Sequence, residues 1–493
     1  MSVVQILVIS INLFLLYRFL LKSIGVRSLG IWSVVLAVTS VSQIANFGLS
    51  GSVVKFVSKY QAHGQKDKTS SVIQTAILTI AVSVGALLIL GYPVARFALK
   101  FIIENKSLSS ALSILPLAFI AFWLLLITSV AQSGLDGIHR IDIRSWILIA
   151  DSFSYLVISI FMAKRFGLLG LAYARVLENV LVFIASWIFL RNQLPFLPWL
   201  PRRWNKATLK EIFGYGANLQ IISIASLLHH TVTMSFLSRF GGLSMAGYYE
   251  MAAKMLWQVR SLIASATFVI APTIAHLKET GPEKIKAVYA TSYELLLYLA
   301  IPLFSMLIVA IPFISLVWIE FYEKNFIFSA SILALGWFFN LISVPAYYVN
   351  MGIGELRWNV RSVLGAGLLN VVLGVAGGFL AGGRGVIVGW ILALIGGSLI
   401  VLIPFYKKEA ISARKVLPRT YWAEALVCLV GIGVSFILRK AKWIALPPLF
   451  LAGGLAVSIG MMIIIPMWMH PMRKRLIGWV GNDLLKRTPE ISV

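Results

Sequence analysis

Residues 385–405 read GVIVGWILALIGGSLIVLIPF, a run in which no side chain carries a charge. A helix rises about 1.5 Å per residue, so about 20 apolar residues are needed to cross ~30 Å of hydrocarbon. This run is long enough, and similar runs recur from one end of the 493-residue chain to the other. We therefore predict an all-α polytopic membrane protein.

The composition leads to the same class of protein. Hydrophobic residues make up 59% of the chain and charged residues only 12%, against roughly 25% charged in soluble proteins. This excludes an ordinary soluble enzyme, a disordered chain and a secreted disulfide scaffold. The single cysteine, Cys428, allows no intrachain disulfide. The net charge of +25 resides in short loops between apolar runs, so it indicates contact with membrane lipid headgroups rather than with nucleic acid.

The same criterion gives fourteen candidate spans, at 3–21, 29–50, 71–95, 110–131, 145–163, 168–190, 213–236, 246–275, 290–318, 327–349, 362–380, 385–405, 422–438 and 444–468. The first span lacks a basic leader and a cleavage site, so we expect it to stay in the membrane. With the N-terminus inside, about 26 Lys and Arg lie on the cytoplasmic side and about 14 on the other. The positive-inside rule then predicts a multi-pass protein of the inner or plasma membrane with both termini cytoplasmic.

The two halves of the chain resemble each other at a spacing of about 215–217 residues. The run Gly30-Ile31-Trp32 matches Gly247-Tyr248-Tyr249, and the glycines at 167 and 170 match those at 382 and 385. Six spans per repeat is an even number, so the repeats are parallel and related by an axis along the membrane normal. Two six-helix bundles of this kind form the usual architecture of an alternating-access transporter.

The predicted domains follow from this repeat and from the loops. They are an N-terminal six-helix bundle at 1–190, a basic cytoplasmic linker at 191–211, a C-terminal six-helix bundle at 212–406, two additional helices at 407–468 and a basic cytoplasmic tail at 469–493.

Several motifs resemble those of one transporter family. They are GIW at 30–32, NFGLSGSVVKFV at 46–57, FGYG at 213–216, and FLSRFGG at 236–242 followed by AGYYEMAAK at 246–254. They are similar to motifs of the polysaccharide-biosynthesis and O-antigen flippases, a branch of the multidrug/oligosaccharidyl-lipid/polysaccharide exporter superfamily with a MATE-like fold. The resemblance extends over almost the whole chain. One departure is Asn46, where many relatives carry Asp.

The resemblance implies a function and its partners. The expected substrate is a polyprenyl-diphosphate-linked oligosaccharide, turned from the cytoplasmic to the outer leaflet for O-antigen or exopolysaccharide synthesis. Transport is expected to be driven either by a proton or sodium gradient or by trapping of the substrate outside, and glycan polymerase and assembly enzymes are candidate partners. No nucleotide-binding loop or metal-ligand spacing occurs in the sequence, so no cofactor and no metal are expected and the protein is not expected to be an enzyme. The alternatives are a MATE-type drug/cation antiporter and a membrane glycosyltransferase or glycan polymerase, which the short outer loops disfavour.

Charged side chains within the spans are the candidate site, because a charge in hydrocarbon is costly and marks function by default. The predicted cationic cavity for the diphosphate comprises Arg260, Lys254, Arg175 and Arg18. For Arg18, snorkelling to the headgroups is the alternative. For the others the alternative is a structural ion pair, since Arg175-Glu178 and Glu250-Lys254 have the spacing of neighbours on a helix.

Three acids and one histidine complete the candidates. Glu250, Glu178 and Asp151 are the predicted coupling or paired acids, and for Asp151 a solvated helix end is the alternative. His229 is the candidate for proton titration, with an interhelical hydrogen bond as the alternative. His229 and His230 are adjacent on one helix, so only one of them can face a cavity.

Overall fold

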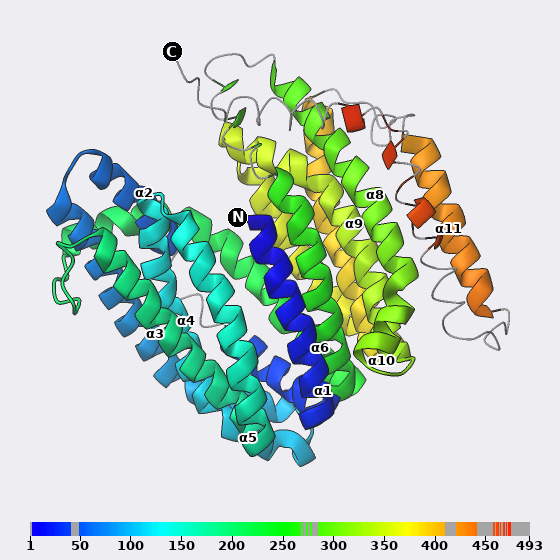
Figure 1. Cartoon of the computed structure of the whole chain (residues 1–493), viewed down its shortest axis with the longest axis horizontal. Coiled ribbons are helices and arrows are strands. Elements are labelled where there is room, and N and C mark those ends of the chain that lie inside the picture. The colour runs from blue at the N-terminus through cyan, green and yellow to red at the C-terminus, as the bar shows by residue number, and fades with distance from the viewer. Residues whose placement is uncertain are drawn as a thin grey trace, which may run out of the picture. The chain divides into compact units, whose positions relative to one another are not determined.

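The computed structural model describes residues 2–40, 49–267, 284–409 and 421–440, with short pieces between 268 and 283 and between 457 and 474. Within these residues the regular structure is helical and contains no strand. The helices, labelled in Figure 1, are α1 (Ser2–Ser40), α2 (Leu49–Ala62), α3 (Lys66–Ile102), α4 (Asn105–Gly137), α5 (Ile141–Gln193), α6 (Lys206–Thr267), α8 (Ile285–Trp318), α9 (Lys324–Ile353), α10 (Arg357–Lys408) and α11 (Trp422–Lys440).

The four longest helices each consist of two limbs joined at a kink. The non-helical residues are Gly25 in α1, Gly167 in α5, Gly242 in α6 and the Ala381–Gly382 pair in α10. Every predicted span from 3–21 to 422–438 lies, wholly or in large part, on a helix or on one limb of a kinked helix. The last span, the 469–493 tail and the start of the 46–57 motif lie wholly or largely outside the described residues. The all-α membrane fold is thus confirmed.

The predicted repeat appears in the backbone itself. The kink glycines Gly25 (φ 76°, ψ 161°) and Gly242 (φ 79°, ψ 166°) have nearly the same conformation. So do Gly167 (φ 57°, ψ −132°) and Gly382 (φ 59°, ψ −145°). These left-handed φ values favour glycine. Each pair is separated by the spacing at which the two halves of the sequence resemble each other.

The turns that end α4 and α9 also match. After α4, the His139 N–H donates to the Asp136 carbonyl (3.0 Å) and the Arg140 N–H to the Leu135 carbonyl (2.9 Å). After α9, the Gly354 N–H donates to Met351 (3.2 Å) and the Glu355 N–H to Asn350 (2.9 Å). This is the same helix-ending motif, in which the residue with φ > 0 closes the last turn.

The second limbs of α1 and α6 approach each other through reciprocal glycine contacts. A Cβ at Gly30 would collide with the carbonyl oxygen of Leu243, and a Cβ at Gly247 would collide with that of Val26. Gly30 and Val26 occupy the repeat positions of Gly247 and Leu243. A two-fold axis produces reciprocal contacts of this kind, in which each half presents the same two positions to the other half. The two limbs are therefore related by a pseudo-two-fold axis.

The chain forms two compact units. Unit 1 comprises 1–258, 324–329 and 363–397, and unit 2 comprises 259–323, 330–362 and 398–493. These units cut across the predicted bundles, and the domain boundary at the linker stays a prediction. In unit 1, α4 packs against α2, α3 and α5, and α5 packs against α1 (Figure 1). In unit 2, α8 packs against α11.

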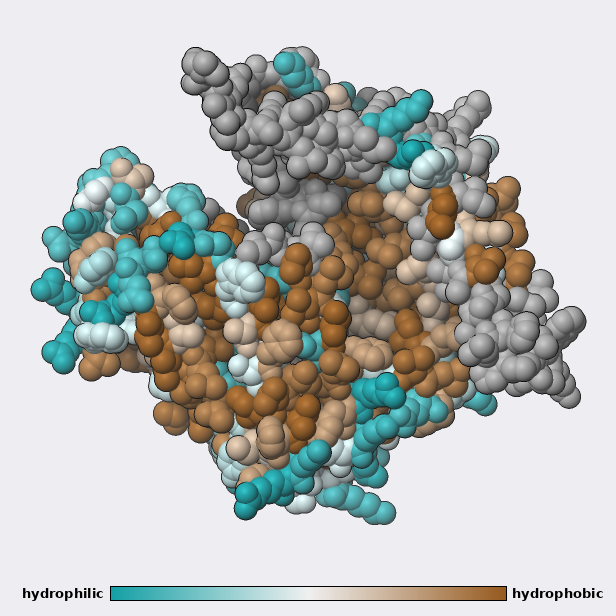
Figure 2. Space-filling view, viewed as in Figure 1, coloured by the Kyte–Doolittle hydropathy of each residue, from teal (hydrophilic) through white to brown (hydrophobic). Residues whose placement is uncertain are grey.

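The outer face of unit 1 is suited to lipid. Val82, Ile89 and Leu90 of α3 are 71%, 76% and 73% exposed. Figure 2 shows hydrophobic side chains along the flanks of the helices and hydrophilic side chains near their ends. An apolar flank between polar ends matches a bilayer, whose hydrocarbon core lies between polar headgroups. Apolar side chains can stay exposed there, because lipid is as apolar as the protein interior.

Candidate functional site

Arg175 and Glu178 form an ion pair on the second limb of α5. The Arg175 guanidinium lies 3.2 Å from the Glu178 carboxylate, whose side chain is only 3% exposed. The Asn179 amide donates to the same carboxylate at 3.0 Å. The guanidinium also lies over the Tyr155 ring, 4.9 Å from its centroid. The predicted pair therefore exists, and α5 folds back at Gly167 so that its first limb supplies the ring.

Two further groups surround this pair. Asp151 of α5 lies beside Glu178, and its buried Oδ1 has no hydrogen-bond partner in the described part of the chain. Tyr17 of α1 is buried and lies within electrostatic range of both Arg175 and Glu250. The structure thus places Asp151, which is partly buried, beside the Arg175–Glu178 pair. The single cation Arg175 thus lies near two neighbouring carboxyl groups, those of Glu178 and Asp151.

Glu250 is the centre of a second cluster, on α6. Its side chain is 5% exposed, and its two oxygens lie 3.5 Å from the Lys254 ammonium and 3.2 Å from the His230 ring nitrogen. Lys254 and His230 are 48% and 42% exposed. The carboxylate of Glu250 is thus enclosed, whereas the side chains of both its partners are partly exposed and accessible to a ligand.

The two adjacent histidines have different surroundings. The Nε2 of His229 lies 2.9 Å from the Val363 carbonyl, and its ring lies 5.3 Å from the Trp390 ring. Both contacts are with α10. The structure places His229 in an interhelical hydrogen bond, the alternative weighed from the sequence, and His230 beside the acid.

Arg260 lies in unit 2, held by a neutral amide and an aromatic ring. Its guanidinium donates to the Asn340 carbonyl oxygen at 3.2 Å and 3.4 Å, and it lies 4.9 Å from the centroid of Trp337. Asn340 in turn donates to the Ser398 hydroxyl at 3.1 Å. Arg18, the fourth predicted cation, lies on α1 next to Tyr17 and is partly buried.

Sequence reasoning missed several partners of these charges. Tyr155 and Asn340 are ordinary residues within apolar spans, and only the packing of distant segments brings them to Arg175 and Arg260. His230 carried a signal, since one histidine of the adjacent pair must face away from the other. Which of the two histidines faces Glu250 depends on how the two limbs of α6 meet at the Gly242 kink, and the sequence does not specify that geometry.

Solved membrane transporters share the fold of this chain. A MATE-family multidrug transporter of the MOP superfamily in an inward-facing conformation matches with a TM-score of 0.70 at 14% identity, over 82% of this chain and 96% of that one. The lipid II flippase MurJ in an inward closed conformation matches with a TM-score of 0.72 at 17% identity, over 96% and 99%. At these identities the likeness shows the fold, which is that of the MATE-like membrane transporters.

The sequence identifies the family within that class. A family model described as "Polysaccharide biosynthesis protein" matches residues 2–278, so the chain belongs to that family. A putative O-antigen transporter from Shigella flexneri is 19% identical over 69% of this chain and 80% of that protein. The uncharacterized membrane protein EpsK of Bacillus subtilis (strain 168) is 23% identical over 89% of this chain and 88% of that protein. The resemblance noted in the motifs is thereby confirmed.

Proposed function

We propose that this protein is a flippase that moves a polyprenyl-diphosphate-linked oligosaccharide from the cytoplasmic to the outer leaflet by alternating access. The observation that carries the proposal is a pair of cations within predicted spans of unit 1, Arg175 and Lys254, each held beside a buried carboxylate. The family, the similarity in sequence to a putative O-antigen transporter and the similarity in fold to a lipid II flippase support the same class of substrate.

These cations meet the physical requirement of moving a charged headgroup across the membrane. A diphosphate with its sugars cannot enter ~30 Å of hydrocarbon unaided, because transfer of charged and hydroxyl groups from water costs many kcal/mol. In the proposal Lys254 and Arg175 exchange their carboxylate partners for phosphate oxygens when the substrate arrives. Arg260 of unit 2, which donates to Asn340 and lies over the Trp337 ring, is a further cation of the proposed site.

The acids supply the proposed coupling site. Asp151 and Glu178 are adjacent carboxyl groups that share Arg175. The Glu250 cluster is the reverse arrangement, in which one acid is shared by His230 and Lys254. A carboxyl pair of this kind can hold a proton or a sodium ion, and it is relieved of its cation when that cation binds phosphate. In the proposal phosphate binding thus frees the carboxyl pair for the coupling ion, so the substrate and the ion bind together.

Transport in sealed liposomes tests the proposal. Fluorescent polyprenyl-diphosphate oligosaccharide is placed in the inner leaflet and its appearance outside is followed. The variants are Lys254→Met and Arg175→Met, with Arg96→Met, an exposed residue of α3, as the control for the loss of one positive charge. We expect wild type and Arg96→Met to translocate the lipid, and each site variant to lose at least about tenfold in rate, the value of one charge-assisted contact.

Two results would contradict the proposal. Uptake of organic cations against a proton or sodium gradient, without movement of any lipid-linked glycan, would establish the MATE-type antiporter. Growth of the glycan chain without translocation would establish a polymerase. Translocation that is unchanged in Lys254→Met and Arg175→Met would retain the flippase and remove these residues from its site.

A further inference from the structure

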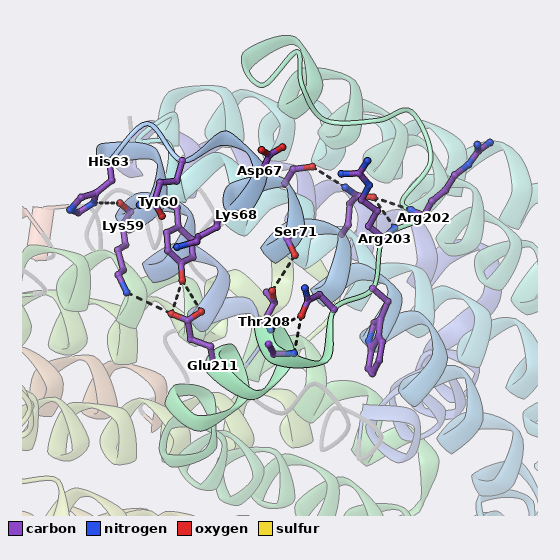
Figure 3. A pocket seen from close by; sticks show the side chains of 16 residues that line it. Lys59, Tyr60, His63, Asp67, Lys68, Ser71, Arg202, Arg203, Thr208 and Glu211 are labelled. Carbon is purple, nitrogen blue, oxygen red and sulfur yellow. Dashed lines mark hydrogen bonds and ion pairs between the residues drawn. The ribbon is translucent and has the colours of Figure 1, made fainter.

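A polar cavity of about 1070 Å³ lies in unit 1, apart from the charge clusters described above. Its walls are the end of α2, the start of α3, the 191–211 linker and the start of α6 (Figure 3). Four cationic side chains line it, against two acidic ones. The cations are Lys59, Lys68, Arg202 and Arg203, and the acids are Asp67 and Glu211.

The two acids do not cancel the positive charge of the cavity. Glu211 is already engaged, because the Tyr60 hydroxyl donates to its oxygens at 2.6 Å and 2.7 Å and Lys59 lies 3.6 Å away. Asp67 lies in the first turn of α3. Two helices, α3 and α6, begin at this cavity, and helix N-termini favour anions.

The linker is fixed in place by its backbone, which frees its arginine side chains. The N–H groups of Arg202 and Arg203 both donate to the Gln74 side-chain oxygen, at 3.0 Å and 3.1 Å. Gln74 itself is 2% exposed and donates to Ser70 at 2.8 Å. Because the backbone makes these bonds, neither arginine side chain is needed to hold the linker, and both side chains are exposed (Figure 3).

The linker also contacts α3 through a tryptophan. The Trp204 indole donates to the Thr79 hydroxyl at 3.1 Å, and Thr79 lies within the predicted span 71–95. Trp199, Leu200 and Trp204 are 66%, 62% and 52% exposed. Tryptophans next to arginines are typical of the membrane interface, where the ring enters the acyl boundary and the cation meets phosphate.

We propose that this cavity binds a phosphate-bearing anion, in the first place the headgroup of an anionic membrane lipid, between Arg202, Arg203 and Lys68. The bound headgroup would attach the linker to α3 at the membrane surface. The inference needs no transport activity, and it concerns charges other than those assigned to the flipped substrate.

Thermal unfolding of the purified full-length protein in detergent tests the inference. The ligands are dioctanoyl phosphatidylglycerol, dioctanoyl phosphatidylcholine and inorganic pyrophosphate, each titrated separately. The site variant is Arg202→Gln/Arg203→Gln, and Lys68→Gln probes the opposite wall. Arg96→Gln/Lys100→Gln removes two charges from the other end of α3 and serves as the matched control. The backbone anchoring of the linker makes no use of the arginine side chains, so the site variant should fold.

We expect phosphatidylglycerol to raise the Tm of wild type saturably and phosphatidylcholine to have a much smaller effect. The apparent affinity should fall about 10- to 30-fold in the site variant, fall less in Lys68→Gln and stay unchanged in the control. If pyrophosphate reproduces the shift, and the site variant abolishes it, the ligand is a soluble phosphate and the site stands. The inference is overturned if wild type shows no saturable shift, or if the site variant and the control respond alike.

Discussion

At the scale of the residue, the feature of interest is a buried carboxylate whose neighbours determine its charge. Glu178 is 3% exposed beside Arg175, and Glu250 is 5% exposed beside Lys254 and His230. An isolated carboxylate in such a place would be very costly, so each acid persists only with its cation. A cation held in this way remains available for an anionic substrate, because the substrate can replace the carboxylate.

A double-mutant cycle on Arg175 and Glu178 tests this pairing. Arg175→Leu leaves Glu178 buried without its cation, and we expect a loss of about 2 kcal/mol in unfolding free energy. Arg175→Leu/Glu178→Leu removes both charges and should cost less than the sum of the two single changes. Unfolding in detergent, followed by circular dichroism, gives the four values. Strict additivity of the two changes would show that the pair is not coupled.

Tyr60 gives a prediction outside the membrane spans. Burial of the phenol, together with its hydrogen bond to Glu211, raises the pKa of Tyr60 to about 12. The protonated form is favoured in the folded state, so its contribution is complete below the ordinary pKa of 10 and disappears as the pH rises to about 12. Tyr60→Phe should lower the unfolding free energy by about 1 kcal/mol at neutral pH. The difference from wild type should narrow above pH 10, and a difference that stays constant would contradict the assignment.

At the scale of the element, two helices depend on glycines where their backbones nearly touch. Gly30 faces the Leu243 carbonyl and Gly247 faces the Val26 carbonyl. Close approach of helices through small residues is the usual device of membrane proteins, because burial of apolar surface gives no advantage in lipid. The same glycines appear in the sequence as one of the repeated motifs, so the repeat and the helix contact have one origin.

Substitution of these glycines tests the pseudo-symmetric contact. Gly30→Ala and Gly247→Ala should each reduce the unfolding free energy by about 1–3 kcal/mol, since the added Cβ meets backbone that cannot yield. The matched control is Gly91→Ala on α3, where a Cβ has nothing within 4 Å and alanine favours the helix. Thermal unfolding in detergent measures all three. Equal behaviour of Gly91→Ala and Gly30→Ala would refute the close approach.

At the scale of the whole molecule, the orientation in the membrane follows from charge. The excess of Lys and Arg predicts that the α2–α3 turn, the linker and both termini face the cytoplasm. Helix α3 has 37 residues, so it spans roughly 55 Å and its two ends must lie on opposite sides of a bilayer. The proposed direction of flipping depends on this orientation.

Labelling with an impermeant maleimide tests the orientation. In a Cys428→Ser background, His63→Cys lies just before α3 and Lys106→Cys just after it, and both positions are exposed. Intact cells should label Lys106→Cys only, and inverted vesicles should label His63→Cys only. The reverse pattern would place both termini outside.

The membrane spans of this protein could be predicted from its sequence, but the partners of its buried charges could not. The spans are stretches of apolar residues, so their approximate limits could be read from the sequence, and the positions of the repeated glycines indicated the two-fold relation between the halves. The partners of the charges could not be read in this way. Tyr155 meets Arg175 only because α5 folds back at Gly167, and His230 rather than His229 meets Glu250 because of the way the two limbs of α6 meet at Gly242.

The sequence by itself determined that the chain is helical, that it crosses the membrane many times, that its two halves repeat and that it carries ionisable groups within its spans. These properties depend on hydrophobicity and periodicity, which act locally along the chain. Only the tertiary structure decided which groups meet: Tyr17 near both Arg175 and Glu250, Asn340 on Arg260, and the linker arginines beside α3. Such meetings depend on the rotation of each helix and the angle of each kink, because a side chain reaches only a few ångströms from its backbone.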